Sequence, residues 1–431
     1  MTDWSQLPRD VVEVIARRLT TYFDALRFRA VCSSWRSAVS QSPHRLPCHF
    51  PIVPNEGFVE TTCGFYLSKR TIYRLGLPED RISTCIGSSE ASDGWLIKVE
   101  EDVPDMMHLL NPLTETQIKP LPSMFPKVLD LSDLRISELG QDYVLQYINY
   151  RPFVNSFVDA GSLYMEKVAF FSSNSSLSAS SPADDNDKFA LLTIHVSGKL
   201  AMFKSGDEKW TIIEDQRSPY DDVICFKGKF YAVDSMGRIV IVEPSATVTL
   251  IASHESHVFG GDKKYLVESE GDLLLVDLYL SMDTGDDSPF ENMDIDDDFY
   301  ERIESYIVEK TVRFKVYKLY EGRQNWVELQ SLGDRLLFLG DNCSFSASAC
   351  DFPGCKGNRI YFTDAFNCSN GEDDYGFKDV GVFNLDDGCI GPLASYPGYS
   401  KLFWPPPSWI ADPSAGSEDS SAMVISFNAV P

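Results

Sequence analysis

A short unit of apolar strands recurs along most of this 431-residue chain, and it restricts the folds that the chain can adopt. In each unit an apolar run leads through a Gly-containing turn to an aromatic and aliphatic run that ends in Asp. Lys229-Phe-Tyr-Ala-Val-Asp234 and Arg359-Ile-Tyr-Phe-Thr-Asp364 are two copies of this run. A second hairpin ends on a tryptophan, as in Lys209-Trp-Thr-Ile-Ile213 and Asn325-Trp-Val-Glu-Leu329. Small sheets of this kind cannot bury their faces alone, but a ring of them can.

The spacing of these units favours a β-propeller over residues 61–392. We count about six units at intervals of about 40–50 residues, which is the length of a propeller blade. The sequence therefore predicts a mainly-β propeller of about six blades. A pair of stacked sheets, as in a β-sandwich, is the alternative that the same runs allow.

Three segments depart from the repeat. The Ser-rich tract 172–181 is predicted to be a flexible loop, and the acidic stretch 281–304 a disordered loop between two strands of one blade. Residues 393–431 form a Pro-rich C-terminal segment that includes Trp404-Pro-Pro-Pro-Ser-Trp409. We expect an extended start to this segment, followed by either disorder or a final strand.

Residues 1–45 have a helical pattern instead. Val12, Ile15 and Leu19 follow one another at spacings of three and four residues, which places them on one face of a helix. Pro8 stands where proline is favoured, at the first turn of this helix. A small helical head is therefore predicted before the β-rich body.

The head continues with two further predicted helices. One covers Ala25–Cys32, and a short third helix holds Trp35. Residues 46–60 are expected to be a linker. The whole chain is thus predicted to be an α+β multidomain protein, with a three-helix head and a propeller.

The charge of the chain limits its partners. The net charge is −26, yet residues 1–45 hold seven arginines against four acidic residues, so the negative charge belongs to the body. Binding to nucleic-acid phosphates needs Lys and Arg, which argues against a nucleic-acid partner. We also expect no membrane partner, because no run approaches eighteen apolar residues and the N-terminus lacks the pattern of a signal peptide.

The most specific motif lies in the head. Phe28-Arg-Ala-Val-Cys-Ser-Ser-Trp-Arg36 follows a Leu-Pro start and an Ile-x3-Leu stripe, and together these features resemble the F-box. About 40 residues are too few for a self-sufficient core, so such a unit leaves apolar surface for a partner groove. The alternative is that the three helices are ordinary core helices of a larger domain. The residues expected to bind the adaptor are Leu7, Pro8, Val11, Val12, Ile15, Leu19, Leu26, Val31, Cys32 and Trp35.

The body extends this resemblance. With Asp3-Trp-Ser-Gln-Leu-Pro-Arg-Asp10 at its start, the chain is similar to plant F-box proteins that carry a kelch-like β-propeller of unknown function. It departs from regular kelch repeats, because the Gly-Gly pair is obvious only at Gly260-Gly261. The resemblance implies a substrate receptor of an SCF-type ubiquitin ligase. In that role the F-box docks on a Skp-family adaptor, and through it on a cullin, while the propeller captures a target protein.

Two other functions stay open. The chain could be an F-box scaffold that acts outside a ligase, which co-migration with adaptor and cullin would distinguish. It could also be a propeller enzyme whose head is an oligomerisation element, which a tightly bound cofactor would favour. The resemblance implies no catalytic residue, and we predict a non-catalytic protein in the nucleus, the cytoplasm or both.

Motifs for metals and cofactors are weak in this sequence. His254 and His257 lack further ligands at zinc spacing. Asp294-x-Asp296-x-Asp298 resembles the start of a calcium loop, but Phe299 stands at the sixth position where glycine is required. We therefore predict no metal and no cofactor.

Overall fold

The structure is a computed structural model of the whole chain. Among the described residues, no helix is both long and apolar enough to cross a bilayer. The structure describes residues 4–16, 28–29, 31–38, 50–51, 64–77, 94–103, 106–114, 116–118, 128–130, 134–147, 165–172, 189–195, 197–214, 219–252, 260–284, 307–320, 325–340, 342–352, 354–364, 380–396, 402–404, 406–411 and 424–427.

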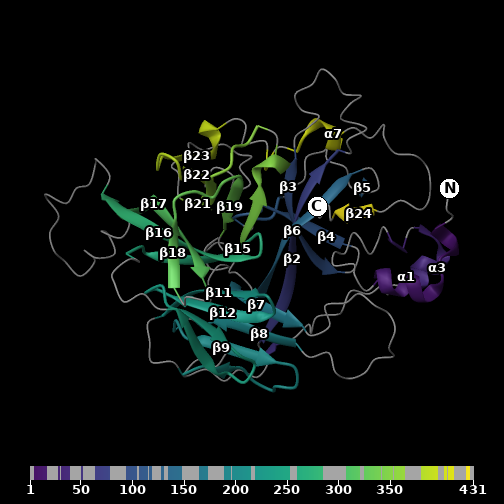
Figure 1. Cartoon of the computed structure of the whole chain (residues 1–431), viewed down its shortest axis with the longest axis horizontal. Helices are drawn as coiled ribbons and strands as arrows, with labels where there is room; N and C mark the ends of the chain where they lie inside the picture. The colour runs from purple at the N-terminus through teal and green to yellow at the C-terminus, as the bar shows by residue number, and fades with distance from the viewer. Residues whose placement is uncertain are drawn as a thin grey trace, which may run out of the picture.

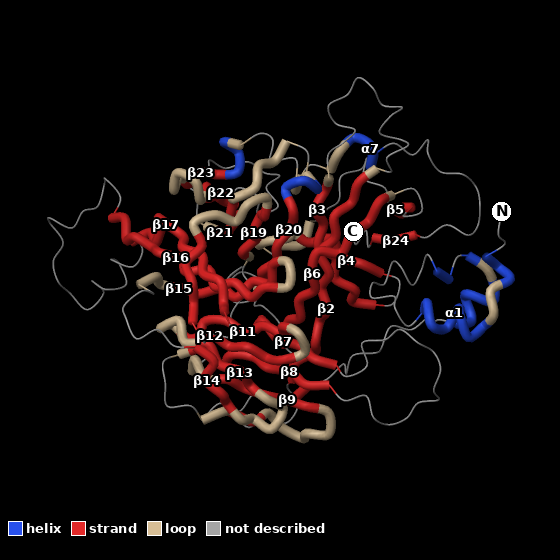
Figure 2. Tube along the Cα trace, in the orientation of Figure 1, coloured by secondary structure: helices blue, strands red, loops and turns tan. Residues whose placement is uncertain are grey.

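The body consists of β-sheets arranged around a centre (Figures 1 and 2). The largest sheet has eleven strands, in the order β10-β9-β8-β7-β6-β2-β3-β4-β24-β5, and its remaining strand β1 pairs with β2. These strands are β1 (Phe50–Pro51), β2 (Gly64–Gly76), β3 (Trp95–Val103), β4 (Met106–Leu110), β5 (Val128–Asp130), β6 (Arg135–Tyr147), β7 (Met165–Ser172), β8 (Phe189–Ile194), β9 (Leu200–Lys204), β10 (Thr211–Ile212) and β24 (Val424–Phe427).

Three smaller sheets follow along the chain. Two have four strands each, in sequence order, and the last has five strands in the order β20-β19-β21-β22-β23. Their strands are β11 (Tyr220–Phe226), β12 (Lys229–Asp234), β13 (Ile239–Val242), β14 (Val248–Ala252), β15 (Lys263–Ser269), β16 (Asp272–Thr284), β17 (Ile307–Tyr320), β18 (Asn325–Leu329), β19 (Arg335–Leu339), β20 (Ser344–Ser348), β21 (Arg359–Thr363), β22 (Val380–Asn384) and β23 (Ile390–Pro392).

The innermost strands close a ring. Strand β11 lies against β7 and β15, β15 lies against β20, and β20 lies against β6, which itself pairs with β7. This arrangement is propeller-like, as the repeat predicts. The predicted number of about six separate sheets is not observed, because the described strands form four. Two four-stranded units, β6-β2-β3-β4 and β7-β8-β9-β10, form one sheet because β6 pairs with β7 from Tyr143↔Val168 to Gln146↔Met165.

The predicted repeat unit is confirmed in its local geometry. Lys227-Gly228 and Glu270-Gly271 connect the first two strands of their sheets, and all four residues have positive φ. Two such residues in succession form the type I′ turn that matches the twist of a hairpin, which explains the glycine in the repeat. Trp326 is buried, and its indole N–H donates to the carbonyl of Gly237 in the neighbouring sheet, 3.2 Å away. The tryptophan of the repeat is therefore a packing residue between blades.

Two predicted boundaries shift. The predicted linker contains β1, and Phe50 is only 1% exposed because its ring packs against Phe203 and Trp210. The predicted C-terminal segment is also part of the body. Buried Leu402 accepts a backbone hydrogen bond from Leu96, 2.8 Å away, and β24 pairs with β4 and β5. Of the two alternatives predicted for its end, the final strand is observed, whereas its start is not wholly extended because Ser408–Ala411 form the short helix α7.

The two predicted insertions are shorter than their sequence composition indicates. Ser172 still belongs to β7, and residues 281–284 still belong to β16. Pairing with β17 continues to the end of β16, where Thr284 lies opposite Ile307. The remaining parts of both insertions lie outside the described residues.

The head contains η1 (Trp4–Gln6), α1 (Arg9–Ala16) and α3 (Ser33–Ala38), and the predicted first and third helices are therefore observed. The first helix is described only to Ala16, whereas the apolar stripe predicted a helix through Leu19. Half of the residues of the predicted second helix lie outside the described residues, so a three-helix head stays a prediction.

The paired ends of β16 and β17 generate a prediction about the acidic insertion. Replacing residues 285–306 by Asn-Gly should leave the melting temperature unchanged, because Thr284 and Ile307 are already register partners that a two-residue turn can join. Thermal unfolding followed by circular dichroism measures this. A matched replacement of residues 279–312 should lower the melting temperature, because it also removes Thr311, whose N–H donates to Asp364 at 2.9 Å. Equal destabilisation by both replacements would contradict the prediction.

Candidate functional site

The head has a very small core. Val12, Ala16, Phe28 and Ala38 are buried together, and the ring of Phe28 lies 4.4 Å from that of Trp35. Leu7, Ile15 and Trp35 pack partly against this cluster. The described part of the head therefore buries few side chains, as expected for a unit of this length.

A second apolar face of the head is exposed. Val11 and Val14 of α1 are 40% and 52% exposed, and Trp4 and Val31 are 64% and 49% exposed. Residues three apart in a helix are neighbours on its surface, so Val11 and Val14 form one patch on α1. The Arg9–Glu13 ion pair of 2.9 Å lies on the same helix and is open to solvent, where such pairs stabilise little. Helix α1 thus has an apolar core side, and its solvent side carries the Val11 and Val14 patch beside charged residues.

The predicted adaptor-binding residues divide by exposure. Pro8, Val11 and Val31 are exposed, whereas Val12 is fully buried and holds the head together. Leu19 and Leu26 lie outside the described residues. Those that are half-buried are Leu7, Ile15, Cys32 and Trp35.

Sequence reasoning did not single out two exposed apolar residues, Trp4 and Val14. The available signal was the i, i+3 spacing of Val11 and Val14, which runs beside the buried stripe. The structure thus adds two apolar side chains to the exposed surface of the head.

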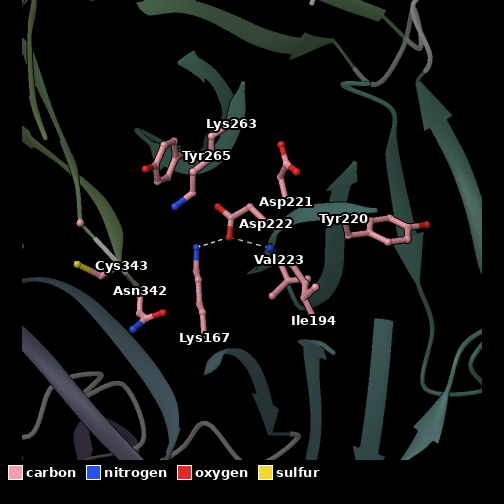
Figure 3. Close-up of a pocket in the computed structure, with 11 residues that line it drawn as sticks. Lys167, Ile194, Tyr220, Asp221, Asp222, Val223, Lys263, Tyr265, Asn342 and Cys343 are labelled. Carbon is pink, nitrogen blue, oxygen red and sulfur yellow. Dashed lines mark hydrogen bonds and ion pairs between the residues drawn. The ribbon is translucent and has the colours of Figure 1, made fainter. Parts of the chain in front are cut away.

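The body contains a cavity of about 240 Å³ beside the inner strands β7, β11 and β15 (Figure 3). It lies where strands of three different sheets come together. Its lining residues come from β7, β8, β11, β15 and the turn before β20: Lys167, Ile194, Tyr220, Asp221, Asp222, Val223, Lys263, Tyr265, Gly340, Asn342 and Cys343. The wall is therefore mixed, with two lysines and two carboxylates among apolar groups.

Asp222 connects the three sheets at this cavity. Its Oδ1 accepts from Lys167 Nζ of β7 at 2.5 Å and from the Val223 N–H at 2.7 Å. Its Oδ2 accepts from the Leu266 N–H of β15 at 2.8 Å. Because β15 is the edge of its sheet, this N–H would otherwise lack a strand partner. The Asp222 carboxylate therefore provides the acceptor that a neighbouring strand would otherwise provide for the Leu266 N–H.

Asp221 stands beside it because of a β-bulge. The register of β11 and β12 shifts between Tyr220 and Asp222, which makes Asp221 the extra residue. A bulge changes the direction in which a side chain points. Here the consecutive carboxylates of Asp221 and Asp222 both accept hydrogen bonds from β15. Asp221 accepts from the Lys264 N–H at 3.0 Å. Burial raises the pKa of Asp221 to about 6, although the Lys264 N–H and the charges of Lys264 and Lys263 act in the opposite direction.

In the ranges that the structure describes, no three His, Cys, Asp or Glu side chains gather as metal ligands. His254, His257 and the acidic stretch around Asp296 lie outside those ranges. The sequence patterns also predict no functional role for Asp221 and Asp222. Their signal was two acidic residues at the start of an otherwise apolar strand, Tyr220-Asp-Asp-Val-Ile-Cys-Phe226.

The head and the ring together define a class of protein: a small helical N-terminal unit with an exposed apolar face, joined to a β-propeller. Comparison with known proteins agrees with this division. Residues 4–46 match the F-box domain, and residues 64–384 match the KIB1-4 beta-propeller. The chain belongs to the family of F-box proteins that carry this propeller. The kelch-like character of the repeat stays a prediction.

Several Arabidopsis thaliana proteins are similar to the chain over nearly its whole length. F-box protein SKIP23 is 44% identical, over 95% of this chain and 96% of the relative. F-box protein At2g17036 is 33% identical, over 95% of each. A putative F-box protein, At5g60060, is 30% identical, over 89% of this chain and 94% of the relative. A plant F-box protein with a propeller, as predicted, is therefore confirmed.

The contacts of Asp222 predict its contribution to stability. Asp222→Ala should lower the free energy of unfolding by about 3 kcal/mol, because it leaves a largely buried ammonium and two backbone N–H groups without their acceptor. Urea unfolding of the full chain measures this. Glu214→Ala is the matched control, since the Lys199–Glu214 pair is exposed at 43% and 74% and should contribute little. Similar losses in both variants would refute the role given to Asp222.

The raised pKa of Asp221 predicts a pH dependence of stability. The native carboxyl holds its proton up to about pH 6, above the ordinary range of an unfolded Asp, so its contribution to stability is lost as the pH rises through this window. Asp221→Asn should remove this loss. The melting temperature of the variant relative to wild type should therefore be higher at about pH 7.5 than at about pH 5. A difference that does not vary with pH would contradict the raised pKa.

Proposed function

We propose that the protein is the substrate receptor of an SCF-type ubiquitin ligase. The head docks on a Skp-family adaptor, which connects the protein to a cullin, and the propeller captures the target protein. Transfer of ubiquitin is then carried out by other subunits, so the chain itself is non-catalytic. It acts in the nucleus, the cytoplasm or both.

One observation supports this proposal most directly: the exposed apolar face of the head. A unit with so small a core would normally cover its valines, yet Val11, Val14 and Val31 are 40–52% exposed. Exposed apolar surface of this kind marks a protein-binding site. The match of residues 4–46 to the F-box domain supports a Skp-family adaptor as the partner of this face.

The division of charge supports a separate role for each part. The chain carries a net charge of −26, while its first 45 residues are mildly basic. An acidic adaptor surface would approach the head and be repelled by the body, which orients the complex. The propeller then faces away from the adaptor, where its loops are open to a target.

The exposed valines provide a test that leaves the core of the head intact. Val11→Glu with Val14→Glu should abolish co-purification with a Skp-family adaptor, because each places a charge in an apolar contact. Co-purification of the full chain from cells that express both proteins measures this.

The matched control for this pair is Val312→Glu. Val312 is a valine of β17 that is 46% exposed, and it lies far from the head in the sequence. This variant should retain the adaptor. Retention by the double variant would refute docking through α1, and failure of well-folded wild type to bind any Skp-family adaptor would refute the ligase function.

A further inference from the structure

The guanidinium of Arg74, near the end of β2, is held in place by contacts that use only part of it. Its Nε donates to the backbone carbonyl of Asp351, 2.6 Å away, in the short helix η6 (Ala349–Asp351) that follows β20 (Figure 2). Its Cζ also lies 5.5 Å from the centroid of the Phe352 ring. These two contacts fix the position and the plane of the guanidinium.

The two terminal nitrogens of Arg74 are not used by these contacts. A guanidinium has five N–H donors, and the bond from Nε accounts for one of them. Within the part of the chain that the structure describes, Nη1 and Nη2 of Arg74 have no hydrogen-bond acceptor, and no carboxylate forms an ion pair with this residue. The side chain is half-buried. Its outer N–H groups can therefore bind water or a ligand.

The charge of Arg74 is only weakly compensated by its surroundings. Burial lowers the pKa of Arg74, and the charge of Arg135 acts in the same direction, while Asp351 acts in the opposite direction. An arginine with an ordinary pKa of about 12.5 still keeps its charge near neutral pH after such a shift. An anion that bound to this guanidinium would provide the compensation that the protein itself does not.

Two glycines leave space for this arrangement. A Cβ at Gly94, just before β3, would lie 2.8 Å from Arg74 Nε and 3.0 Å from the Asp351 carbonyl oxygen, so a larger residue would displace the guanidinium. A Cβ at Gly76, the last residue of β2, would lie 3.6 Å from Nη1 and 3.8 Å from Nη2. A longer side chain at this position would cover the two nitrogens that have no acceptor. Glycine at both positions therefore keeps the outer part of the guanidinium uncovered.

Arg135 adds a second positive charge beside this group. It is the register partner of Gly76 on β6. Arg74 and Gly76 are two positions apart and share one face of β2, and register partners of antiparallel strands also share a face. Arg135 therefore lies on the face that carries Arg74. It is exposed and has contacts of its own, so Arg74 is the principal donor and Arg135 contributes mainly its charge.

We propose that Arg74 and Arg135 bind a phosphate monoester, carried by a serine or threonine of a bound protein or by a small free molecule. The parallel N–H groups of an arginine match two oxygens of a phosphate. A phosphate monoester carries nearly two negative charges at neutral pH, so two cations on one face favour it over a carboxylate. Where the phosphate belongs to a captured target, this inference rests on the proposed function.

The site is separate from the cavity described above. Lys167 of the cavity pairs with Val144 near the end of β6, whereas Arg135 is the first residue of that strand. The two sites therefore lie toward opposite ends of β6, and a change in one leaves the lining residues of the other in place.

Calorimetric titration of the full chain tests the proposal with defined probes. A blocked glycine-phosphoserine-glycine peptide represents a protein side chain, its serine and glutamate counterparts lack the phosphate, and glycerol phosphate represents a small free molecule. Arg74→Gln should weaken phosphopeptide binding about tenfold, because it removes charge-assisted hydrogen bonds. Arg135→Gln should weaken it less. The matched control is Arg313→Gln, since Arg313 is exposed and also lies over an aromatic ring, 4.3 Å from the centroid of Tyr279, and this variant should keep full affinity.

The possible outcomes separate the proposal from its alternatives. Stronger binding of the phosphopeptide indicates a protein side chain, stronger binding of glycerol phosphate indicates a free molecule, and both support the site. Equal binding of the serine or glutamate peptide would overturn it, as would absent phosphate binding by folded wild type or full affinity in Arg74→Gln. If thermal unfolding shows that Arg74→Gln does not fold, full affinity in Arg135→Gln has the same meaning. Arg74→Gln should still co-purify with the adaptor, so the site can fail while the ligase function stands.

Discussion

The ring depends on how the inner edges of its sheets are satisfied. An edge strand presents N–H and C=O groups that have no strand partner, and a buried group in this state costs free energy. Asp221 and Asp222 accept from the Lys264 and Leu266 N–H groups, while Ser344 Oγ of β20 donates to the Leu266 carbonyl at 2.5 Å. Strand β15 is thus bonded to both neighbouring sheets through side chains. The centre of the ring is held by polar bonds, and tryptophans such as Trp326 pack further out between the sheets.

The local pattern predicted much of this fold, because each strand and turn follows from its own residues. The Gly228 turn and the packing role of Trp326 are of this kind. The division into sheets could not be predicted in the same way, since the pairing of β2 with β6 links residues about 70 positions apart. The insertion boundaries also moved, because Ser281 to Thr284 look like loop residues by composition but pair with β17. Pairing with β17 therefore outweighs the low intrinsic strand propensity of these four residues.

The head and the cavity differ in how far the sequence predicts them. The F-box pattern is contiguous, so the string that ends at Trp35 and Arg36 identifies it directly. The predicted contact set still mixes core and surface, because the stripe that contains Val12 looks the same whether it faces a core or a partner. The cavity leaves no contiguous pattern. Lys167, Lys263 and Asn342 lie on three separate strands or turns, and only the closure of the ring brings them together.

Strand β24 lies far along the chain from β4 and β5, yet it pairs with both of them in the sheet that also holds β1. This sheet therefore stays incomplete until β24 has been made, and before then the edges of β4 and β5 lack their common partner. Exposed strand edges favour association with other chains. A chain that ends before β24 would keep the residues that match the F-box domain and would carry an open sheet edge in the body.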